Sequence, residues 1–411
     1  MVFLSKNNLQ LILIILYDIK KMVIIMKKVL CLILFLLTAC TDEKILITDI
    51  NSDIKIKNNL TFEYKDVIHL KDIITIPNGE LITPNMTLDT NSLGPKNFKF
   101  LYKINSQIKN DSFNINVVDT TKPILHISNL TTTVGKEIDM LNKAMCGDNY
   151  DRKIECYIEG NYDFYNTSTY PLTLVAIDSS GNKTERGFKL NVKEKNNSYN
   201  SNYYSIDNLI KAHKTNKTMI GIDVSSWQGD IDWQKVKNAG VEFAMIRIGF
   251  GQNNLDRMTY DSKFRQNLRN AKANNIKVGI YFYSHAKNRY DALKQAKWIV
   301  EALDGEKLDL PIAFDWEIWS NFNSYNLNFH DLNDIAKTFL KEIERNGYKS
   351  MNYGSAFFLN NIWNTPEYDT WLAHYTDKTD YDKPYYIWQL SNQGKVPGID
   401  GYVDLNVLYK K

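Results

Sequence analysis

Residues 310–317 read Leu-Pro-Ile-Ala-Phe-Asp-Trp-Glu. The apolar run bounded by Pro311 predicts a buried strand, on which side chains two positions apart share a face. Asp315 and Glu317 are therefore expected to point together, with Cα atoms roughly 6.6 Å apart at about 3.3 Å per residue. Two such carboxyl groups cannot both ionise at their usual pKa, so one should keep its proton near neutral pH. This pairing is the equipment for glycoside hydrolysis, and a strand end with two solvated acids is the alternative.

The chain around this strand alternates between strand and helix patterns from residue 219 onward. Apolar runs predict strands at 221–223, 244–247, 278–281, 311–317 and 350–353, and amphipathic segments predict helices at 233–239, 261–274, 291–303 and 331–345. Three more strands, at 371–373, 386–389 and 402–404, follow with no proper helix between them. Five βα units and three strands predict a modified, TIM-like α/β barrel over 218–411, with its site at the carboxyl ends of the strands.

Several motifs of this region resemble one enzyme family. They are Gly-Ile-Asp-Val-Ser-Ser-Trp-Gln-Gly-Asp-Ile-Asp-Trp at 221–233, Asp-Trp-Glu at 315–317, Trp-Leu-Ala-His-Tyr at 371–375, Ile-Trp-Gln at 387–389 and Val-Asp-Leu-Asn at 403–406. In this order they resemble glycoside hydrolase family 25, the lysozyme-type N-acetylmuramidases, over about residues 219–409. The resemblance implies a modified α/β barrel with few helices after the fifth strand, in agreement with the pattern above.

The resemblance assigns roles to four carboxylates. Glu317 is the expected general acid, because it matches the family's glutamate and a leaving alkoxide needs a proton. Asp315 is expected to raise the pKa of Glu317 by its charge and to orient a substrate acetamido group. Asp223 and Asp404, at the ends of the first and last strands, are expected to add negative charge that suits an oxocarbenium-like transition state. Taken alone, Asp223 is also typical of a turn and Asp404 of a loop cap.

Aromatic residues at strand ends are candidates for stacking on sugar rings, because they carry an apolar face and a polar group. We expect substrate contacts from Tyr281, Trp371, Tyr353, Trp227 and, as a polar contact, Gln389. Each aromatic residue is also an ordinary core residue, and Arg247 either contacts substrate or pairs with a carboxylate inside the barrel.

The region before the barrel has a different composition. Short runs of Val, Ile, Thr, Phe and Tyr broken by turn residues predict two all-β modules, at 41–118 and 119–193. The second opens with Asp-Thr-Thr-Lys-Pro at 119–123 and ends with Ala-Ile-Asp-Ser-Ser-Gly-Asn at 176–182, phrases that resemble bacterial Ig-like modules of surface proteins. We interpret both as spacers or binding modules. A polar stretch, 194–217, predicts a linker with few contacts across it.

The amino terminus predicts export. Met26-Lys27-Lys28 and the apolar segment 29–37 have the order of a signal peptide, and Leu-Thr-Ala-Cys at 37–40 resembles a bacterial lipobox. We therefore expect residues 1–39 to be removed, Met26 to be the true start, and Cys40 to carry a lipid that anchors the protein to the outer face of the cell membrane. An oxidising exterior permits Cys146 and Cys156 to pair through a hairpin, and two free thiols are the alternative.

The net charge and the motifs of the chain limit the classes of function that it can have. Residues 1–39 hold five of the 50 basic and one of the 47 acidic side chains, so the rest of the chain has a net charge of −1 and no nucleic-acid partner is expected. Neither a metal nor a cofactor is expected, because the histidines are scattered and no ligand motif appears.

Together these observations predict a surface-anchored muramidase acting on peptidoglycan glycan strands. A hydrolase of another N-acetylated polysaccharide, such as chitin, and a non-catalytic wall-binding or adhesion lipoprotein remain the alternatives.

Overall fold

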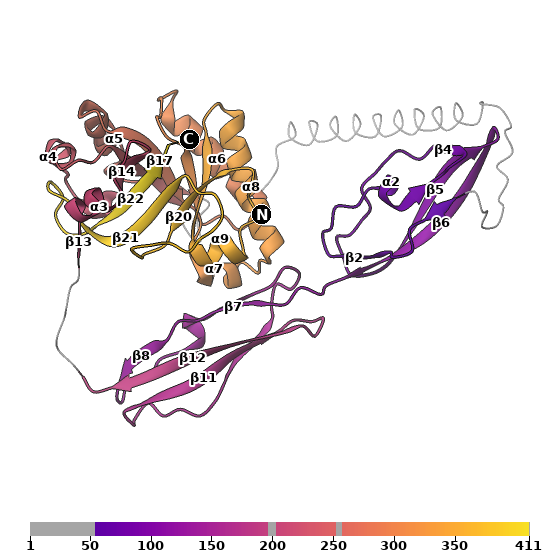
Figure 1. Ribbon diagram of the computed structural model, residues 1–411, viewed down its shortest axis with the longest axis horizontal. Helices are drawn as coiled ribbons and strands as arrows, with labels where there is room; N and C mark the ends of the chain where they lie inside the picture. Colours follow the sequence, from indigo (N-terminus) through magenta and orange to yellow (C-terminus); the bar gives the residue numbers. More distant parts are fainter. Residues whose placement is uncertain (1–53, 196–202, 252–256, 411) are drawn as a thin grey trace, which may run out of the picture. The chain divides into compact units, whose positions relative to one another are not determined.

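The structure, a computed structural model, describes residues 54–195, 203–251 and 257–410, which divide into two compact units after Asp119 (Figure 1). The predicted signal peptide and Cys40 lie outside these residues. Among the described residues, no helix combines the length and the apolar composition needed to cross a membrane.

The described part of the first unit is nearly all β, as predicted for 41–118. Its strands are β1(Lys55–Ile56), β2(Thr61–Glu63), β3(Ile74–Thr75), β4(Gly79–Leu81), β5(Gly94–Ile104) and β6(Gln107–Val118), with one short helix, α2(Leu70–Ile73). A four-stranded sheet has the order β2-β6-β5-β4, and β1 pairs with β3. Asn105 and Ser106 connect β5 to β6 with positive φ angles of 48° and 64°, as a two-residue hairpin turn requires. Alternate residues of both strands then face the core.

The second unit begins with a further β module. Its elements are β7(Ile124–His126), β8(Leu130–Thr133), η1(Leu141–Lys143), β9(Met145–Gly147), β10(Glu155–Glu159), β11(Ser168–Ile177) and β12(Lys183–Lys193). The sheet β10-β11-β12-β8 faces the two-stranded sheet β7-β9 across an apolar core that includes Leu125, Leu174 and Leu190. At the β11–β12 turn, Asp178 accepts the backbone N–H of Asn182, and Gly181 has φ +87°. The Gly-Asn phrase of the sequence is therefore a turn.

Cys146 and Cys156 form a disulfide. The hairpin that was expected to bring them together is absent, because Cys146 lies in β9 and Cys156 in β10, and these strands belong to different sheets. The bridge therefore ties the two sheets of this module to each other.

The rest of the second unit is a closed barrel of eight strands. They are β14(Thr218–Val224), β15(Phe243–Gly251), β17(Lys277–Tyr283), β18(Ile312–Asp315), β19(Ser350–Ser355), β20(Asp369–Ala373), β21(Ile387–Lys395) and β22(Val403–Tyr409). The pairings from β14 through β21 are parallel, whereas β22 runs antiparallel between β21 and β14 and closes the ring. A short strand, β16(Met258–Tyr260), adds to β15. All eight predicted strands are present, so the barrel prediction is confirmed.

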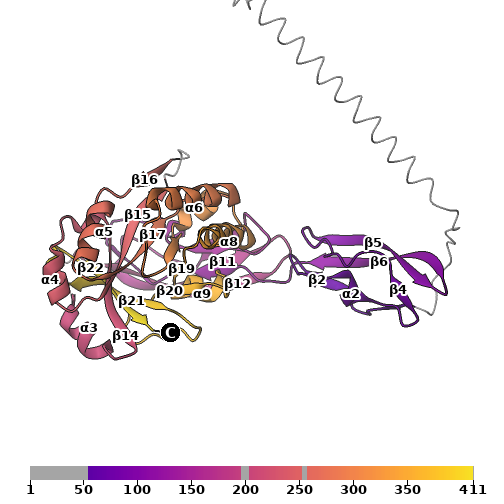
Figure 2. The same cartoon turned by 90° about the horizontal axis from the view of Figure 1, so that it is seen from above.

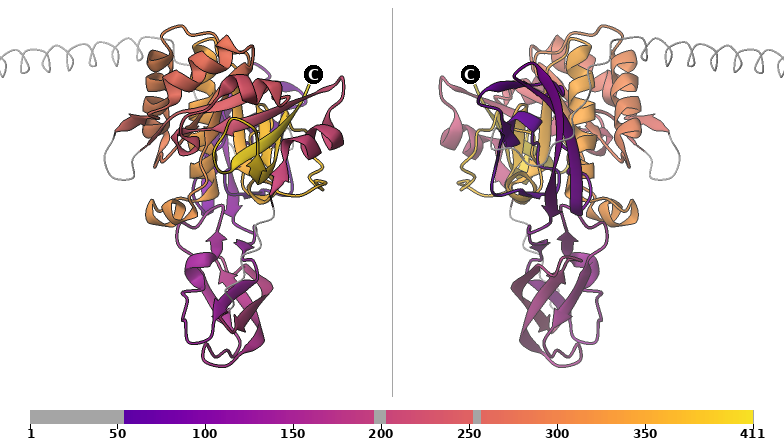
Figure 3. Two further views of the ribbon diagram at one scale, coloured as in Figure 1. Left: turned by 90° about the vertical axis from the view of Figure 1, so that its left-hand side faces the viewer. Right: turned by 90° about the vertical axis from the view of Figure 1, so that its right-hand side faces the viewer.

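Helices cover the outside of the barrel, as Figures 2 and 3 show. The helical segments between the barrel strands are η2(Ser226–Gln228), α4(Trp233–Asn238), α5(Phe264–Ala273), α6(Arg289–Leu303), α7(Trp319–Ser324), α8(Phe329–Arg345) and α9(Ala356–Asn361). The apolar stripe of α8 packs on the strands with Leu332, Ile335 and Phe339 fully buried. A separate cluster fills the interior of the barrel with Met245, Ala313 and Met351. Beyond α9 the chain returns to strands without a further helix, as predicted.

Part of the predicted linker 194–217 belongs to the barrel. Residues 204–213 form β13(Tyr204–Ser205), which pairs with β21, and α3(Ile206–His213), whose Ile206 and Leu209 are buried. The polar composition hid this helix, because only one of its faces is apolar. Ser205 caps it by accepting the backbone N–H of Asn208.

The prediction of few contacts between the β modules and the barrel is wrong for the second module. Arg152 forms an ion pair with Asp331 in α8 at 2.8 Å, and Asn328 donates to the carbonyl of Tyr150 at 2.9 Å. Gly147 lies against the rings of Trp319 and Phe329, where a Cβ atom would be 2.8–2.9 Å from ring carbons. The second module therefore packs against α7 and α8.

Candidate active site

Four carboxylates gather at the mouth of the barrel. Asp223 is near the end of β14, and its register partner on the antiparallel β22 is Asp404. Asp315 is the last residue of β18, and Glu317 follows two positions later. The charge of Asp223 acts on both Asp315 and Glu317, so the structure brings together all four predicted acids.

Glu317 lies just beyond the strand that was predicted to contain it. Between the two acids, Trp316 turns into the layer under the helices, where its Nε1–H donates to the carbonyl of Ala286 at 3.1 Å. Asp315 and Glu317 are left on the opposite side, as the alternation predicted. Strand β18 ends at Asp315, two residues before Glu317.

The Glu317 side chain is exposed to solvent at the mouth, although protein surrounds most of it. Burial is the largest cause that raises the pKa of Glu317, and the charge of Asp223 adds to it. The charges of Glu317 and Asp315 also oppose each other, as the pairing predicted, although burial is the larger cause. A substrate can therefore reach a carboxyl group that holds its proton to a higher pH than an ordinary glutamate.

Asp315 is buried, and its Oδ1 atom has no hydrogen-bond partner among the described residues. Burial raises the pKa of Asp315 well above its usual range, and the charges of Glu317 and Asp223 act in the same direction. Arg247 lowers this pKa by a smaller amount. An unpaired oxygen in a buried carboxyl group costs free energy unless a ligand pairs with it.

Asp223 and Asp404 interact directly, and the pKa of each is raised. Asp223 accepts hydrogen bonds from Gln389 at 2.8 Å and from Asn406 at 2.7 Å, which favour its charged form although burial raises its pKa. Burial, the charge of Asp223 and a hydrogen bond to Asp223 raise the pKa of Asp404 to about 9. Asp404 therefore keeps its proton to a much higher pH than an ordinary aspartate, beside a carboxyl group that accepts two amide hydrogen bonds.

A hydrogen-bonded network fixes Asp223 from behind. The hydroxyl groups of Tyr353 and Tyr375 both donate to Oε1 of Gln389, at 3.0 and 3.1 Å. On the other side, Nε1–H of Trp371 donates to Oδ1 of Asn406 at 2.9 Å. The amide nitrogens of Gln389 and Asn406 are thus both directed at one carboxylate oxygen.

Several residues that were predicted to contact substrate belong to this network instead. Trp371 is 1% exposed and Gln389 3% exposed, so neither presents a face to a sugar, and both instead support Asp223. Tyr353 is also buried, and it packs edge-on against Trp371 with 4.8 Å between ring centroids. Tyr281 is half-buried and contacts Trp371 in the same way at 5.8 Å. Trp227, at 84% exposed, is open to a ligand on the β14 side.

Sequence reasoning did not single out three residues of the site. Tyr375 and Asn406 stood inside quoted motifs, at the last positions of the segments 371–375 and 403–406, and their side-chain types gave the available signal. Asp261 gave none. It pairs with Arg247 at 2.8 Å and accepts the backbone N–H of Ser226 at 2.9 Å, so Arg247 does pair with a carboxylate, which lies between β16 and α5.

Comparison with known proteins identifies the family of this region. A model of the family described as glycosyl hydrolases family 25 matches residues 222–399. The protein YegX of Escherichia coli (strain K12) is 32% identical over 200 residues, which cover 46% of this chain and 69% of YegX. Lysozyme M1 of Streptomyces globisporus is 30% identical over 201 residues, covering 45% of this chain and 66% of that protein. A solved family 25 glycosyl hydrolase from Bacillus anthracis aligns with a TM-score of 0.42 and 25% identity over 49% of this chain and 93% of that one.

The matched segment contains Asp223, Asp315, Glu317 and Gln389, which lie on or directly after the strands β14, β18 and β21. This chain therefore belongs to glycosyl hydrolase family 25, and residues 222–399 mark its glycoside hydrolase domain.

Proposed function

We propose that this chain is a peptidoglycan hydrolase, an N-acetylmuramidase that cleaves the β-1,4 bond between N-acetylmuramic acid and N-acetylglucosamine. The observation that carries the proposal is the solvent-reachable Glu317 with a raised pKa beside Asp315, Asp223 and Asp404. A non-catalytic wall-binding module has no need of such a set of acids. The lysozyme names of two relatives support the substrate class.

Each side chain has a role in the reaction. Glu317 gives its proton to the glycosidic oxygen as the bond from that oxygen to C1 of the muramic acid breaks. Positive charge develops on the ring, and the ionised Asp223 stabilises it. Water then adds to C1 and returns a proton to Glu317. Asp315 offers its unpaired Oδ1 to the acetamido N–H of the sugar at the reacting position, which fixes the orientation of that group.

Product analysis tests the substrate and the bond. Purified peptidoglycan is digested with the protein, the new reducing ends are reduced with borohydride, and the products are identified by mass spectrometry. A muramidase leaves reduced muramic acid at the ends. Reduced glucosamine ends, or release of sugars from chitin at a comparable rate, would favour another hydrolase. Tight binding to peptidoglycan without any product would favour the wall-binding alternative.

We also propose that the protein acts from the outer face of the cell membrane, with Cys40 lipidated and the β modules as spacers resembling Ig-like modules. The lipobox-like segment 37–40 supports the anchor. Replacing Cys40 with Ala should move the protein from the membrane fraction to the medium, or leave it unprocessed. A variant that stays in the membrane fraction at the normal mature size would contradict the anchor.

A further inference from the structure

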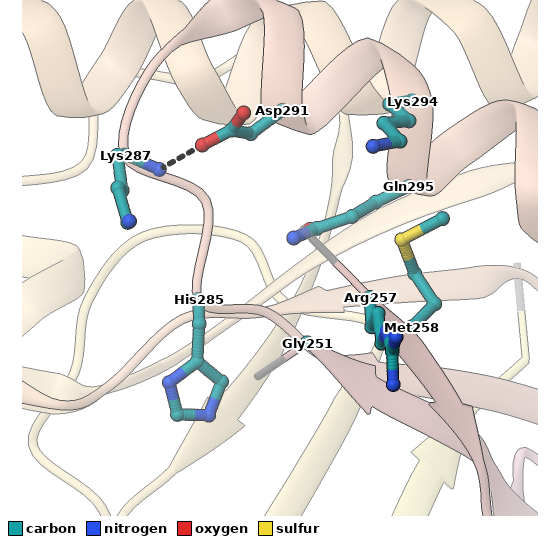
Figure 4. A pocket seen from close by; sticks show the side chains of 8 residues that line it. All are labelled: Gly251, Arg257, Met258, His285, Lys287, Asp291, Lys294 and Gln295. Atoms are coloured by element: carbon teal, nitrogen blue, oxygen red, sulfur yellow. Dashed lines mark hydrogen bonds between the residues drawn. The ribbon is translucent and has the colours of Figure 1, made fainter. Parts of the chain in front are cut away.

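Charged side chains also gather away from the catalytic centre. At the start of α6, Lys287 and Lys294 line a small pocket together with Asp291, so charges of both signs lie there (Figure 4). Near the turn between β11 and β12, by contrast, three acids meet. Asp119, Asp148 and Asp178 each offer a carboxylate oxygen, these oxygens lie within 4.8 Å of one another, and all three side chains are buried. Like charges at this distance repel each other strongly where water is excluded.

Two of these acids come from the phrases that resemble Ig-like modules. Asp119 opens the phrase at 119–123, immediately before the second unit, and Asp178 belongs to the phrase at 176–182. Asp148, directly after β9, is the third acid. Three segments that are far apart in the sequence therefore converge on one point, and the catalytic function uses none of them.

The turn between β11 and β12 holds the acids in place. Asp178 accepts the backbone N–H of Asn182 at 2.7 Å and the side-chain amide of Asn182 at 2.8 Å. The same amide reaches the carbonyl of Thr121 at 3.4 Å, two residues after Asp119. The opening phrase is therefore held against this turn. The carboxylate of Asp178 can still bind a further ligand, because a carboxylate offers about four acceptor sites.

Asp148 is the acid that most needs a partner. Its side chain is 0% exposed, and its Oδ1 accepts the backbone N–H groups of Tyr150 and Asp151, both at 2.8 Å. Its Oδ2 has no hydrogen-bond partner in the described part of the chain, and no basic side chain there forms an ion pair with Asp148 or Asp178. Burial raises the pKa of Asp148, its two backbone hydrogen bonds oppose this, and the charge of Asp178 raises it further. A cation between the acids removes both the repulsion and the cost of the unpaired oxygen.

The donor atoms select the kind of cation. All three are carboxylate oxygens, the ligands of hard cations, whereas Zn²⁺ sites are built mainly from His and Cys. Oxygens bound to one Ca²⁺ at about 2.3–2.6 Å can lie up to about 5 Å apart, so a spread within 4.8 Å fits this ion. Ca²⁺ also tolerates irregular geometry and takes its remaining ligands from carbonyl groups and water, whereas Mg²⁺ demands a near-ideal octahedron.

We propose that Asp119, Asp148 and Asp178 bind one Ca²⁺ ion. The Kd expected for a site of this kind in an extracellular module is about 10⁻⁴–10⁻³ M. The ion also acts on the contact with the barrel, because the backbone carbonyl of Asp148 accepts the N–H of Phe329, the first residue of α8, at 2.9 Å. Calcium therefore stabilises the second β module and the loop through which it contacts α8. This inference does not depend on the proposed catalytic function.

Binding and stability are measured on the full chain, freed of metal with EGTA and then dialysed. Titration calorimetry with CaCl2 should give one bound ion per chain. At 10 mM CaCl2 the melting temperature of the second unit should rise by about 3–8 °C, the shift that follows from this Kd. MgCl2 at the same concentration controls for ionic strength and should shift the melting temperature far less.

Asp148→Asn tests the site directly. Its amide oxygen can still accept the two backbone N–H groups, so the fold should persist, while calcium binding and the calcium-dependent shift should be lost. Asp119→Asn and Asp178→Asn change the other two segments and should have the same effect, so any one folded variant decides. Asp139→Asn, an exposed acid of the same module, is the matched control and should keep both signals.

The remaining outcomes also decide. Wild type that binds no Ca²⁺ at 10 mM would overturn the proposal and mean that Asp148 keeps a proton instead. Calcium binding that survives in the folded variants would place the ion elsewhere, and an equal shift with MgCl2 would mean that the salt acts on the surface charge in general. If none of the three variants folds, one bound ion per wild-type chain with a preference for Ca²⁺ over Mg²⁺ supports the site, and the lack of either overturns it.

Discussion

At the scale of single residues, the central feature is Glu317, which a substrate can reach although protein surrounds most of its side chain. Protein around Glu317 disfavours its charged form, and the ionised Asp223 disfavours it further. Asp315 is more deeply buried and has an oxygen without a partner, which leaves a place for a substrate N–H. The two acids therefore differ in function because they differ in access to solvent.

Replacing Glu317 with Gln should remove the transferable proton and leave the shape of the site. We expect kcat on soluble peptidoglycan to fall by at least about 10²-fold, the lower end of the contribution of a general acid. Glu301→Gln, an exposed change on α6, serves as the control. Turnover of the Glu317 variant close to that of wild type would exclude this residue as the acid.

The pH profile should distinguish the groups that tune Glu317. In Asp223→Asn a charge that raises the pKa of Glu317 is lost, so the alkaline limb of kcat/KM should move to lower pH. In Asp315→Asn a group whose charge opposes that of Glu317 is also lost, so the limb should move to lower pH as well. A limb that stays in place in Asp315→Asn would show that burial and Asp223 alone raise this pKa.

Asp404 should make stability depend on pH. Its pKa of about 9 in the folded protein lies above its ordinary value of 3.8, so its contribution is complete below pH 3.8 and is lost as pH rises toward 9. Asn cannot ionise but can still donate to Asp223. The free energy of unfolding of Asp404→Asn, measured in urea at pH 5, 7 and 9, should therefore rise relative to wild type as pH increases. The exposed Asp400→Asn should show no such trend.

At the scale of elements, the antiparallel last strand organises the site. Because β22 runs between β14 and β21, it sets Asp404 opposite Asp223 and places Asn406 within hydrogen-bond distance of the same carboxylate. Gln389 on β21 completes the arrangement. A parallel eighth strand would give a different register and direction to these groups.

Gln389→Leu should cost about 1–3 kcal/mol in the free energy of unfolding, because it leaves the buried partners Tyr353 and Asp223 without their shared amide. Tyr375→Phe removes one hydrogen bond at a 53% exposed side chain and should cost much less. Urea denaturation at one pH compares the two variants. Equal losses would mean that the network around Asp223 does not contribute to stability.

At the scale of the whole molecule, the second β module is more than a tether. It packs on α7, the helix directly after Glu317, and its disulfide lies next to the contact residue Gly147. The module is therefore placed to stabilise the segment that carries the acid. The barrel itself begins earlier than expected, since α3 buries Ile206 and Leu209 on it.

Gly147→Val should separate the module from the barrel, because even a Cβ atom would lie 2.8 Å from the ring of Phe329. In a fragment of residues 120–411, calorimetry should show one melting transition for wild type and two for the variant. Gly187→Val is the matched control in the same module, since no atom lies within 4 Å of the corresponding Cβ. A single transition in both variants would show that this contact does not couple the two parts.

The sequence by itself determined the eight strands, the order of the βα units and the four acids. Each strand is a local apolar run with its own boundaries, and each acid stands at a strand end or just after one, so neighbouring residues were sufficient evidence. The strand and helix at 204–213 were not predicted, because the one apolar face of this segment is hidden in a polar composition.

Only the tertiary structure decided what each side chain does. Trp227 and Trp371 were equal candidates by type and position, yet the first is 84% exposed and the second 1%. Asp223 meets Asp404 and Asn406 only because β22 closes the barrel against β14. Burial and long-range register depend on partners far away in the chain, and local periodicity carries no information about them.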